Sequence, residues 1–249
     1  EGMQRTGGPT SALVSGRGAG APDDRPRPRA LIEAGYGLGD VVEATPTCHA
    51  MWLLGYDVDF LVQRPDAADL ARLVRGHPAV ARVLDDERDA DPAAYDVGIA
   101  CHGPARVVRR LPPGAWCDVS RGDIAREGLL EANLGPARAL GFAGPPPPHA
   151  IVGPAAATDL APGTVVVHAG SDPRAPFKRW PHWEALCDRL AARGHPVLVV
   201  GTPADESPAR WERRHAHRFD LSLVELAALL RAARAYLGND SGVGHLAGA

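Results

Sequence analysis

The 249-residue sequence has no uninterrupted apolar run near the roughly 18 residues that a membrane-crossing helix needs. Its N-terminus also lacks a charged segment followed by an apolar one, which is the pattern of an export signal. The four cysteines lie far apart without a CxxC pair, which argues against a zinc site, an iron–sulfur cluster and a disulfide framework. We therefore expect a cytoplasmic protein with reduced thiols and no transmembrane segment, and peripheral contact with a membrane stays open.

Excess positive charge is missing as well. The formal net charge is -3, so there is no global basic field of the kind that drives nucleic-acid binding, and we expect no nucleic-acid partner. Lysine is almost absent, because Lys178 is the only lysine among 27 Lys and Arg residues. A composition that replaces lysine by arginine everywhere else favours a specific role for Lys178, although a solvated surface lysine is the plain alternative.

The length of the chain allows two compact α/β domains of about 100 residues each, or one large domain. Residues 1–28 are rich in Gly, Pro, Arg and Asp, and we expect a disordered leader there. Apolar strand patterns and helical patterns then alternate from residue 29 to about residue 120, as in a parallel sheet. Thr45-Pro46 has the form of an N-cap followed by proline at the first helical position. The expected strands are 29–33, 57–62, 81–84 and 95–100, and the expected helices are 45–54, 65–75 and 123–140.

A proline run at 144–148 predicts a stiff extended linker, after which the α/β pattern begins again. Ser222 and Glu225 have the spacing of a capping box and predict the start of a helix. The last apolar run, 234–237, predicts a short buried strand that leads into a helix at Ser241. We thus expect an N-terminal Rossmann-like domain at 29–143, a linker at 144–163 and a C-terminal Rossmann-like domain at 164–249, with further strands at 164–168 and 196–200 and a helix at 181–193.

Three glycine-containing loops each follow a predicted strand, at 35–40, 170–171 and 238–242. In open α/β sheets, ligands bind at these strand ends. The loop at 238–242 leads into a helix whose free N–H groups favour an anion, which indicates a phosphate-bearing ligand. Each loop alone is also typical of an ordinary structural turn, so the indication comes from the three together.

Four segments together resemble the heptosyltransferase-like glycosyltransferases of family 9, which include ADP-heptose:lipopolysaccharide heptosyltransferases. They are Gly37-Leu38-Gly39-Asp40 with Thr45-Pro46; Glu131-Ala132-Asn133-Leu134 before Leu140-Gly141; His168-Ala169-Gly170-Ser171 before Lys178-Arg179-Trp180-Pro181; and Gly238-Asn239-Asp240-Ser241-Gly242 with His245-Leu246-Ala247. The resemblance implies an α/β protein of the GT-B fold, in which two Rossmann-like domains with parallel sheets face each other across a cleft. Family members usually continue for several tens of residues past this last segment, so the resemblance also implies that the second domain is incomplete at Ala249.

The resemblance implies a catalytic role for two residues. Asp40 matches the family's Gly-Asp motif and would act as the base that takes the proton of the acceptor hydroxyl. The alternative for Asp40 is a helix-capping carboxylate. Lys178 would neutralise the charge that builds on the leaving nucleoside diphosphate.

The same resemblance implies a donor site in the C-terminal domain and an acceptor loop in the N-terminal one. Structural alternatives are a turn for Ser171, a helix cap for Asp240 and a packed core histidine for His245. No metal and no cofactor are expected. Gly37 and Gly39 would belong to the acceptor loop, and the donor-binding residues would be Gly170, Ser171, Glu206, Asp240, Ser241, Gly242 and His245.

These features favour a metal-independent glycosyltransferase that moves a heptose or related hexose, with inversion, from a nucleoside-diphosphate sugar, ADP-linked by preference. The acceptor would be a hydroxyl of a glycan or a small-molecule natural product. A non-catalytic module that binds a nucleotide sugar or a partner is the alternative from another class. A Rossmann oxidoreductase is disfavoured, because the glycines after the first strand are spaced GxGxG and not GxGxxG.

Overall fold

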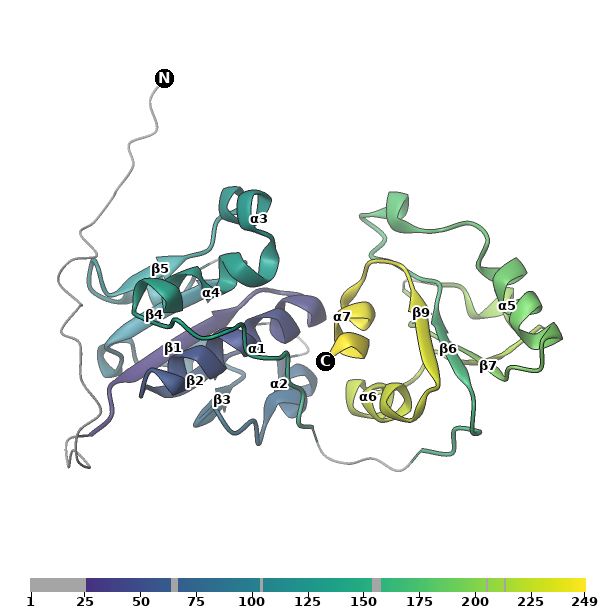
Figure 1. Ribbon diagram of the computed structural model, residues 1–249, viewed down its shortest axis with the longest axis horizontal. Helices are drawn as coiled ribbons and strands as arrows, with labels where there is room; N and C mark the ends of the chain where they lie inside the picture. Colours follow the sequence, from purple (N-terminus) through teal and green to yellow (C-terminus); the bar gives the residue numbers. More distant parts are fainter. Residues whose placement is uncertain (1–25, 64–66, 104, 154–157, 205, 213) are drawn as a thin grey trace, which may run out of the picture.

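The structure, a computed structural model, describes residues 26–63, 67–103, 105–153, 158–204, 206–212 and 214–249. Most of the expected leader, residues 1–25, and part of the expected linker, residues 154–157, lie outside these ranges. The described residues form two parallel β-sheets with flanking helices, one in each half of the chain, and the two halves lie side by side (Figure 1). The α/β class and the parallel sheets that the sequence predicts are confirmed.

The first sheet has five parallel strands in the order β3-β2-β1-β4-β5. Its central strands are buried on both faces, as expected for a sheet that helices cover on each side. Ile32 lies between Phe60 and Ile99 in the register of the three central strands, so three large apolar side chains form one row. The strands are β1 Arg29–Ala34, β2 Asp57–Leu61, β3 Arg82–Leu84, β4 Val97–Cys101 and β5 Trp116–Asp118, the last of which the sequence analysis did not predict.

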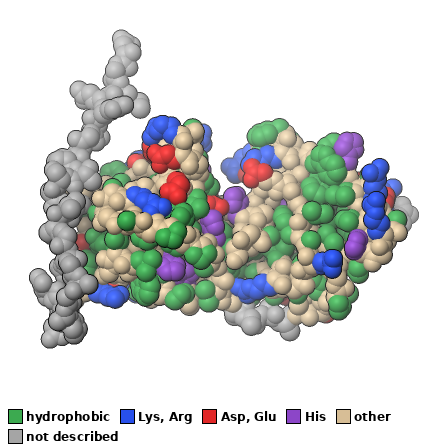
Figure 2. Space-filling model, viewed as in Figure 1, with side chains coloured by type: hydrophobic (Ala, Val, Ile, Leu, Met, Phe, Trp, Pro, Cys, Tyr) green, Lys and Arg blue, Asp and Glu red, His purple; other side chains and the backbone are tan. Residues whose placement is uncertain are grey.

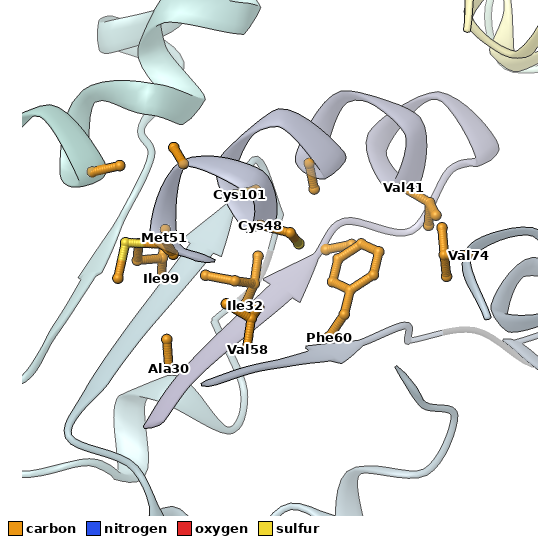
Figure 3. Close-up of a cluster of buried hydrophobic side chains, with 14 of the residues drawn as sticks. Ala30, Ile32, Val41, Cys48, Met51, Val58, Phe60, Val74, Ile99 and Cys101 are labelled. Atoms are coloured by element: carbon orange, nitrogen blue, oxygen red, sulfur yellow. The ribbon is translucent and has the colours of Figure 1, made fainter. Parts of the chain in front are cut away.

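Helix α1 covers one face of this sheet. Figure 3 shows its side chains Val41, Cys48 and Met51 packed against Ile32 and Phe60 of the central strands. The apolar stripe of α1 therefore fixes the start of the helix against the carboxyl end of β1. The helices of this half are α1 Leu38–Leu53, α2 Ala67–Val74, α3 Arg121–Glu127 and α4 Leu129–Ala139. Short 3₁₀ turns occur in both halves, at Glu87–Asp89, Pro92–Ala94, Val108–Arg110, Pro176–Lys178 and Pro208–Arg210.

The predicted helix start at Thr45-Pro46 is wrong, because both residues lie inside α1. A proline inside a helix has no N–H to donate to the carbonyl four residues earlier, which here belongs to Val42. The Thr45 hydroxyl donates to that Val42 carbonyl at 2.8 Å and replaces the missing bond. The helix therefore continues through Pro46, and its N-cap is Gly37.

The helix predicted over 123–140 is two helices, α3 and α4, which meet at Gly128. Gly128 has a φ of 80°, a left-handed angle that a regular helix does not contain and that glycine adopts without a steric cost. Ser120 caps α3, with its hydroxyl accepting the backbone N–H of Asp123. The break lets α4 pack on α1, where the Asn133 side chain donates to the Glu43 carbonyl.

The second sheet has four parallel strands in the order β8-β7-β6-β9. The capping box at Ser222 and Glu225 is present at the start of α6, as the sequence predicts. The expectation of a buried last strand is wrong, because β9 pairs with β6 on one side only and its residues are partly or fully exposed. The elements are β6 Val165–His168, β7 Val197–Val200, β8 Ala216–Arg218, β9 Ala235–Gly238, α5 Trp183–Ala192, α6 Leu223–Ala232 and α7 Gly242–Gly248.

Strand β8 is a further element that the sequence analysis did not predict. The polar segment around His215 and His217 has no metal-ligand spacing and by its sequence predicts a solvated face, which the structure corrects. His217 lies on β8, and the imidazole of His215 is 7% exposed and pairs with Asp188 at 3.0 Å. A three-residue edge strand with two polar side chains, His217 and Arg218, leaves little apolar pattern to detect.

The two halves share an apolar core along their junction. Leu73 of α2 is fully buried and belongs to the cluster formed by Leu226 and Leu229 of α6 and Leu246 of α7. Leu38, the first residue of α1, packs against the same cluster. Figure 1 shows α6 and α7 on the side of the second half that faces α1 and α2. The start of α1 is thus held against the second half by buried apolar surface, and the candidate site lies next to this contact.

Candidate functional site at the junction of the two halves

The connections of both sheets reverse direction once, and ligands of open α/β sheets bind beside such a reversal. In the first sheet the reversal lies between β1 and β4, and in the second it lies between β6 and β9. The loops that follow these strands include the three glycine loops that the sequence singles out. The chain path therefore brings the predicted loops to the carboxyl edges of their sheets.

Asp40 is the third residue of α1 and lies at the carboxyl end of β1. Its Oδ2 accepts the backbone N–H of Gly37 at 2.7 Å, so the carboxylate caps the helix start. A Cβ on Gly35 would approach the Asp40 carboxyl carbon to 2.8 Å and the His102 carbonyl to 2.1 Å. Glycine at this position allows the loop after β4 to come close to the loop after β1. The capping role is present, and the role of Asp40 as base stays a prediction.

The two predicted acceptor-loop glycines have different surroundings. Gly37 is the N-cap of α1, whereas Gly39 lies in its first turn against α7. A Cβ on Gly39 would lie 2.7 Å from Cδ2 of His245, and one on Gly242 would lie 2.9 Å from Cβ of Leu38. Glycines on both helices thus permit a close approach between the halves. The sequence analysis did not predict this contact.

Lys178 and Asp240 lie together on the second half. The Lys178 Nζ is 2.7 Å from Oδ2 of Asp240, and the two side chains are 36% and 70% exposed. The hydrogen bond from Lys178 holds the pKa of Asp240 below its usual range. Nε2 of His245 is 4.0 Å from the other Asp240 oxygen. Lys178, which lies 62 residues before Asp240 in the sequence, is therefore a spatial neighbour of the Asp240–His245 segment.

Asn239 joins the loops around these residues and was not among the predicted site residues. Its Nδ2 donates to the carbonyls of Ala169 and Gly170, at 2.8 and 3.0 Å. Its Oδ1 accepts the backbone N–H of Trp180 and the indole N–H of Trp183, both at 3.1 Å. One buried amide thus holds the loops after β6 and β9 and the segment that carries Lys178. Its signal in the sequence was its place in the segment 238–242, directly before Asp240.

The predicted donor residues Ser171 and Ser241 already have protein partners. Ser171 is buried, and its hydroxyl accepts from Arg179 at 3.1 Å and donates to the Ala175 carbonyl at 3.3 Å. The hydroxyl of Ser241 lies 3.1 Å from Nδ1 of His168. Ser241 is the N-cap of α7, which begins at Gly242 as the sequence predicts.

Glu206 follows β7 and lies apart from this group. Its side chain is 7% exposed, pairs with Arg210 at 3.2 Å and accepts the backbone N–H of Ser207 at 2.9 Å. In this arrangement it stabilises the turn that begins the 3₁₀ segment Pro208–Arg210. Its predicted contact with a ribose stays a prediction.

A carboxylate that the sequence analysis did not single out lies where the two halves meet. Glu43 of α1 accepts from His245 of α7 through Oε1, at 2.8 Å, and pairs with His149 of the linker through Oε2, at 3.0 Å. Burial by itself would raise the pKa of Glu43, but the hydrogen bonds from the two histidines outweigh burial and lower it to about 2. Glu43 is therefore ionised across the whole physiological range.

The same group borders a cavity of about 340 Å³. Figure 2 shows histidine and acidic side chains close together where the two halves meet. The hydrogen bond to Glu43 raises the pKa of His245, against the opposing effect of burial. Within the described ranges, no group of three or more His, Cys, Asp or Glu side chains could hold a metal ion. Independence from metals stays a prediction. The cavity is lined by Glu43, His149, Asp240, Ser241, Gly244, His245 and Gly248.

No described helix has both the length and the apolar character that crossing a membrane requires. No curated protein matches this chain. Residues 154–249 match the family model of Glycosyltransferase family 9 (heptosyltransferase). That segment contains Lys178 and the group from Asp240 to His245.

Several solved structures are similar to this chain along most of its length. The Escherichia coli ADP-heptose lps heptosyltransferase II has a TM-score of 0.60 and 16% identity, covering 88% of this chain and 81% of its own. The family 9 glycosyl transferase of Veillonella parvula has a TM-score of 0.68 and 15% identity, covering 88% and 77%. The Escherichia coli heptosyltransferase WaaC with ADP has a TM-score of 0.58 and 21% identity, covering 88% and 83%.

At these identities the solved structures show the fold, which is GT-B, with a parallel sheet in each half. The family model adds a sequence match over the second half. The resemblance to family 9 that the sequence segments indicated is confirmed, and the sequence match to the family model covers residues 154–249.

Proposed function

We propose that this protein is a glycosyltransferase that moves a heptose or related hexose from a nucleoside-diphosphate sugar, with ADP as the preferred nucleotide, to a hydroxyl of a glycan or natural product, with inversion. One observation carries the proposal most directly. Asp40, at the start of α1, and the group of Lys178, Asp240 and His245 on the second half lie at the same junction between the two sheets. A base on one half and a cationic phosphate site on the other are what such a transfer needs.

The proposed reaction assigns each group a step. The acceptor oxygen attacks the anomeric carbon while its proton passes to the Asp40 carboxylate. The bond between that carbon and the donor's phosphate oxygen breaks, and the electron pair leaves with the nucleoside diphosphate. Lys178 and the imidazolium of His245 stabilise the developing negative charge, with backbone N–H groups at Ser241 and Gly242 as further donors.

The Lys178–Asp240 pair is compatible with this role. An ammonium paired with an exposed carboxylate is held in place without being desolvated, because the two side chains remain 36% and 70% exposed. An incoming diphosphate offers more negative charge than the single carboxylate. We therefore propose that Lys178 exchanges Asp240 for the donor phosphates on binding, and that Asp240 then faces the sugar or His245.

We prefer ADP to the other nucleotides as the donor nucleotide because two of the similar structures are described with ADP or with an ADP-heptose analogue. Thermal unfolding with ADP, GDP, UDP and NAD tests the proposal. ADP at about 100 times its dissociation constant should stabilise the protein by about 2.7 kcal/mol, which amounts to several degrees. Release of ADP from ADP-sugars should then follow with a suitable acceptor. The absence of a shift with any nucleoside diphosphate contradicts the proposal, and a shift with ADP without any turnover favours the non-catalytic binding module.

A further inference from the structure

Glu43 occupies a position from which it can control the donor site without touching the reacting atoms. It lies three residues after Asp40, and residues three apart share one face of a helix. Its carboxylate is 11% exposed and has a histidine on each oxygen. The two histidines come from separate segments, one from the linker and one from α7. Glu43 thus joins three segments of the chain at the wall of the cavity.

The hydrogen bond with Glu43 gives the two ring nitrogens of His245 different roles. Nδ1 donates to the ionised carboxylate, so this nitrogen carries a proton. Nε2 is left on the side of Asp240, 4.0 Å from its Oδ1, and the cavity borders both residues. A ring held in this way can place a second proton, on Nε2, toward an anion in the cavity.

We propose that Glu43 is a positioning residue: it fixes the Nδ1–H of His245, so that Nε2 faces the donor diphosphate as a charged hydrogen-bond donor. This inference rests on the proposed function, because it assumes that the diphosphate binds in this cavity. The chemistry is that of a carboxylate–histidine pair, in which the acid sets the tautomer, the orientation and the charge of the ring.

Three acidic groups near His245 favour its charged form and outweigh the opposing effect of burial. Helix α1 contributes Glu43 and Asp40, and the segment before α7 contributes Asp240, with Lys178 as the partner of Asp240. The linker contributes His149, on the far oxygen of Glu43. From β9, Tyr236 approaches α7 near Gly244, and α6 contributes apolar side chains that pack with Leu246. The acidic groups agree with the raised pKa of His245.

The segment that carries His149 makes a second contact with α1, so the Glu43 group is not an isolated surface ion pair. The Ala150 backbone N–H donates to the Thr45 hydroxyl at 3.1 Å, next to the His149 contact with Glu43. The segment entering the second half is therefore held on α1 at two adjacent points. Because Glu43 is buried and engaged on both oxygens, its carboxylate has little freedom to turn away from His245.

Replacing Glu43 with Gln tests the inference, since glutamine keeps the size and can still accept from His245 but removes the charge. NMR titration of the histidine rings in the full chain should give a lower pKa for His245 in this variant. Calorimetry should show ADP affinity reduced about tenfold at a pH between the two His245 pKa values that the titrations give, where only the wild-type ring keeps its charge, and nearly unchanged at a pH below both. The ratio of the two affinities cancels the ionisation of ADP itself.

Asp188→Asn is the matched control, because Asp188 pairs with another histidine, His215, beside β8 at the opposite edge of the second sheet. It should leave the ADP affinity and its pH dependence unchanged. In a His245→Gln background, Glu43→Gln should have no further pH-dependent effect. An unchanged titration of His245, or an equal loss of affinity at every pH, overturns the inference while leaving the proposed function intact. A wild-type protein that does not bind ADP overturns the proposed function and this inference with it.

Discussion

Two groups of carboxylates in this molecule have similar partners but different surroundings. In the first sheet, Glu33 and Asp59 lie on strands and are buried, with 1% and 2% of their surfaces exposed. At the junction of the halves, Asp40 and Glu43 lie in the first two turns of α1 and Asp240 follows β9, and Glu43 and Asp240 border the cavity. The first group is enclosed by the fold, and the second lies where the fold opens.

The partners of the buried group explain its role. Glu33 accepts the backbone N–H groups of Arg106, Val107 and Val108, so it holds the loop after β4. Asp59 accepts from Arg29, Arg82 and Tyr95 through a single oxygen. These bonds join segments within the first half only. At the junction, by contrast, the exposed pair Lys178–Asp240 can exchange one partner for a ligand, while Glu43 holds His245 in place. We therefore propose stability as the role of the first group and donor binding and transfer as the role of the second.

The largest effect that we expect is on the rate of sugar transfer and comes from a carboxylate of the junction group. Asp40→Asn should lower the rate of sugar transfer by about 10²–10⁴-fold, because an amide takes up no proton. Asparagine keeps an oxygen that can accept the Gly37 N–H, so α1 and the ADP affinity should be preserved. Nucleotide release from the donor measures the rate. Asp69→Asn is the control, since Asp69 is likewise the third residue of a helix, α2, and should retain full turnover. Full turnover of Asp40→Asn would exclude Asp40 as the base.

The next effect concerns stability. Asp59→Asn should lower the free energy of unfolding by about 2–3 kcal/mol at pH 7, because two arginines and a tyrosine lose a buried charged acceptor. Asp159→Asn removes a carboxylate that is 73% exposed and paired with Arg218, and should cost at most about 1 kcal/mol. Urea denaturation measures both, and ADP affinity should not change. An equal loss of unfolding free energy in the two variants would contradict the distinction between buried and exposed carboxylates.

The contribution of Asp59 should also depend on pH in a defined direction. Burial opposes its ionisation, but hydrogen bonds from Arg82 and Tyr95 outweigh burial and lower its pKa. The stabilisation is therefore present above the unfolded-state pKa of about 4 and is lost as the pH falls through the lower folded-state value. Denaturation at several pH values should show the difference between wild type and Asp59→Asn shrinking below about pH 4. A difference that grows on acidification would contradict this assignment.

A smaller effect is expected for the cation at the junction. Lys178→Ala should weaken ADP binding about tenfold while leaving stability nearly unchanged, because its pair with Asp240 is largely exposed. Arg174→Ala is the matched control: Arg174 lies in the same loop, pairs with Asp172 and is 90% exposed. It should leave the affinity unchanged. Calorimetry that gives the same affinity for Lys178→Ala and wild type would remove Lys178 from the donor site.

The smallest expected effect tests the contact between the halves. Gly39→Ala places a Cβ 2.7 Å from the ring of His245, which Glu43 holds in place, and should destabilise the protein by about 1 kcal/mol after the gain in helix propensity is subtracted. Gly135→Ala on α4 meets nothing within 4 Å and should be neutral or stabilising. Thermal unfolding distinguishes the two variants. A Gly39→Ala protein as stable as Gly135→Ala would mean that the halves move apart in solution.

Local patterns explain which parts of the fold the sequence predicted. The capping box at Ser222 and Glu225 is confirmed because its bonds join residues three apart. The helix start predicted at Thr45-Pro46 is wrong for a local reason too. A threonine hydroxyl that can cap a helix start can also replace a hydrogen bond that a proline removes inside a helix. Strands β5 and β8 have three residues each, too few for a period of two to be recognised.

The sequence by itself determined the alternation of strands and helices, the glycine turns at strand ends and the motifs that resemble family 9, because these depend on residues a few positions apart. Only the tertiary structure decided which polar groups meet. Glu43 lies 106 residues from His149 and 202 from His245, and neither pair has a local pattern. Asn239 likewise gains its role from loops about 60 to 70 residues away. Such contacts depend on the order of the strands and on how the halves pack, which no short stretch of sequence encodes.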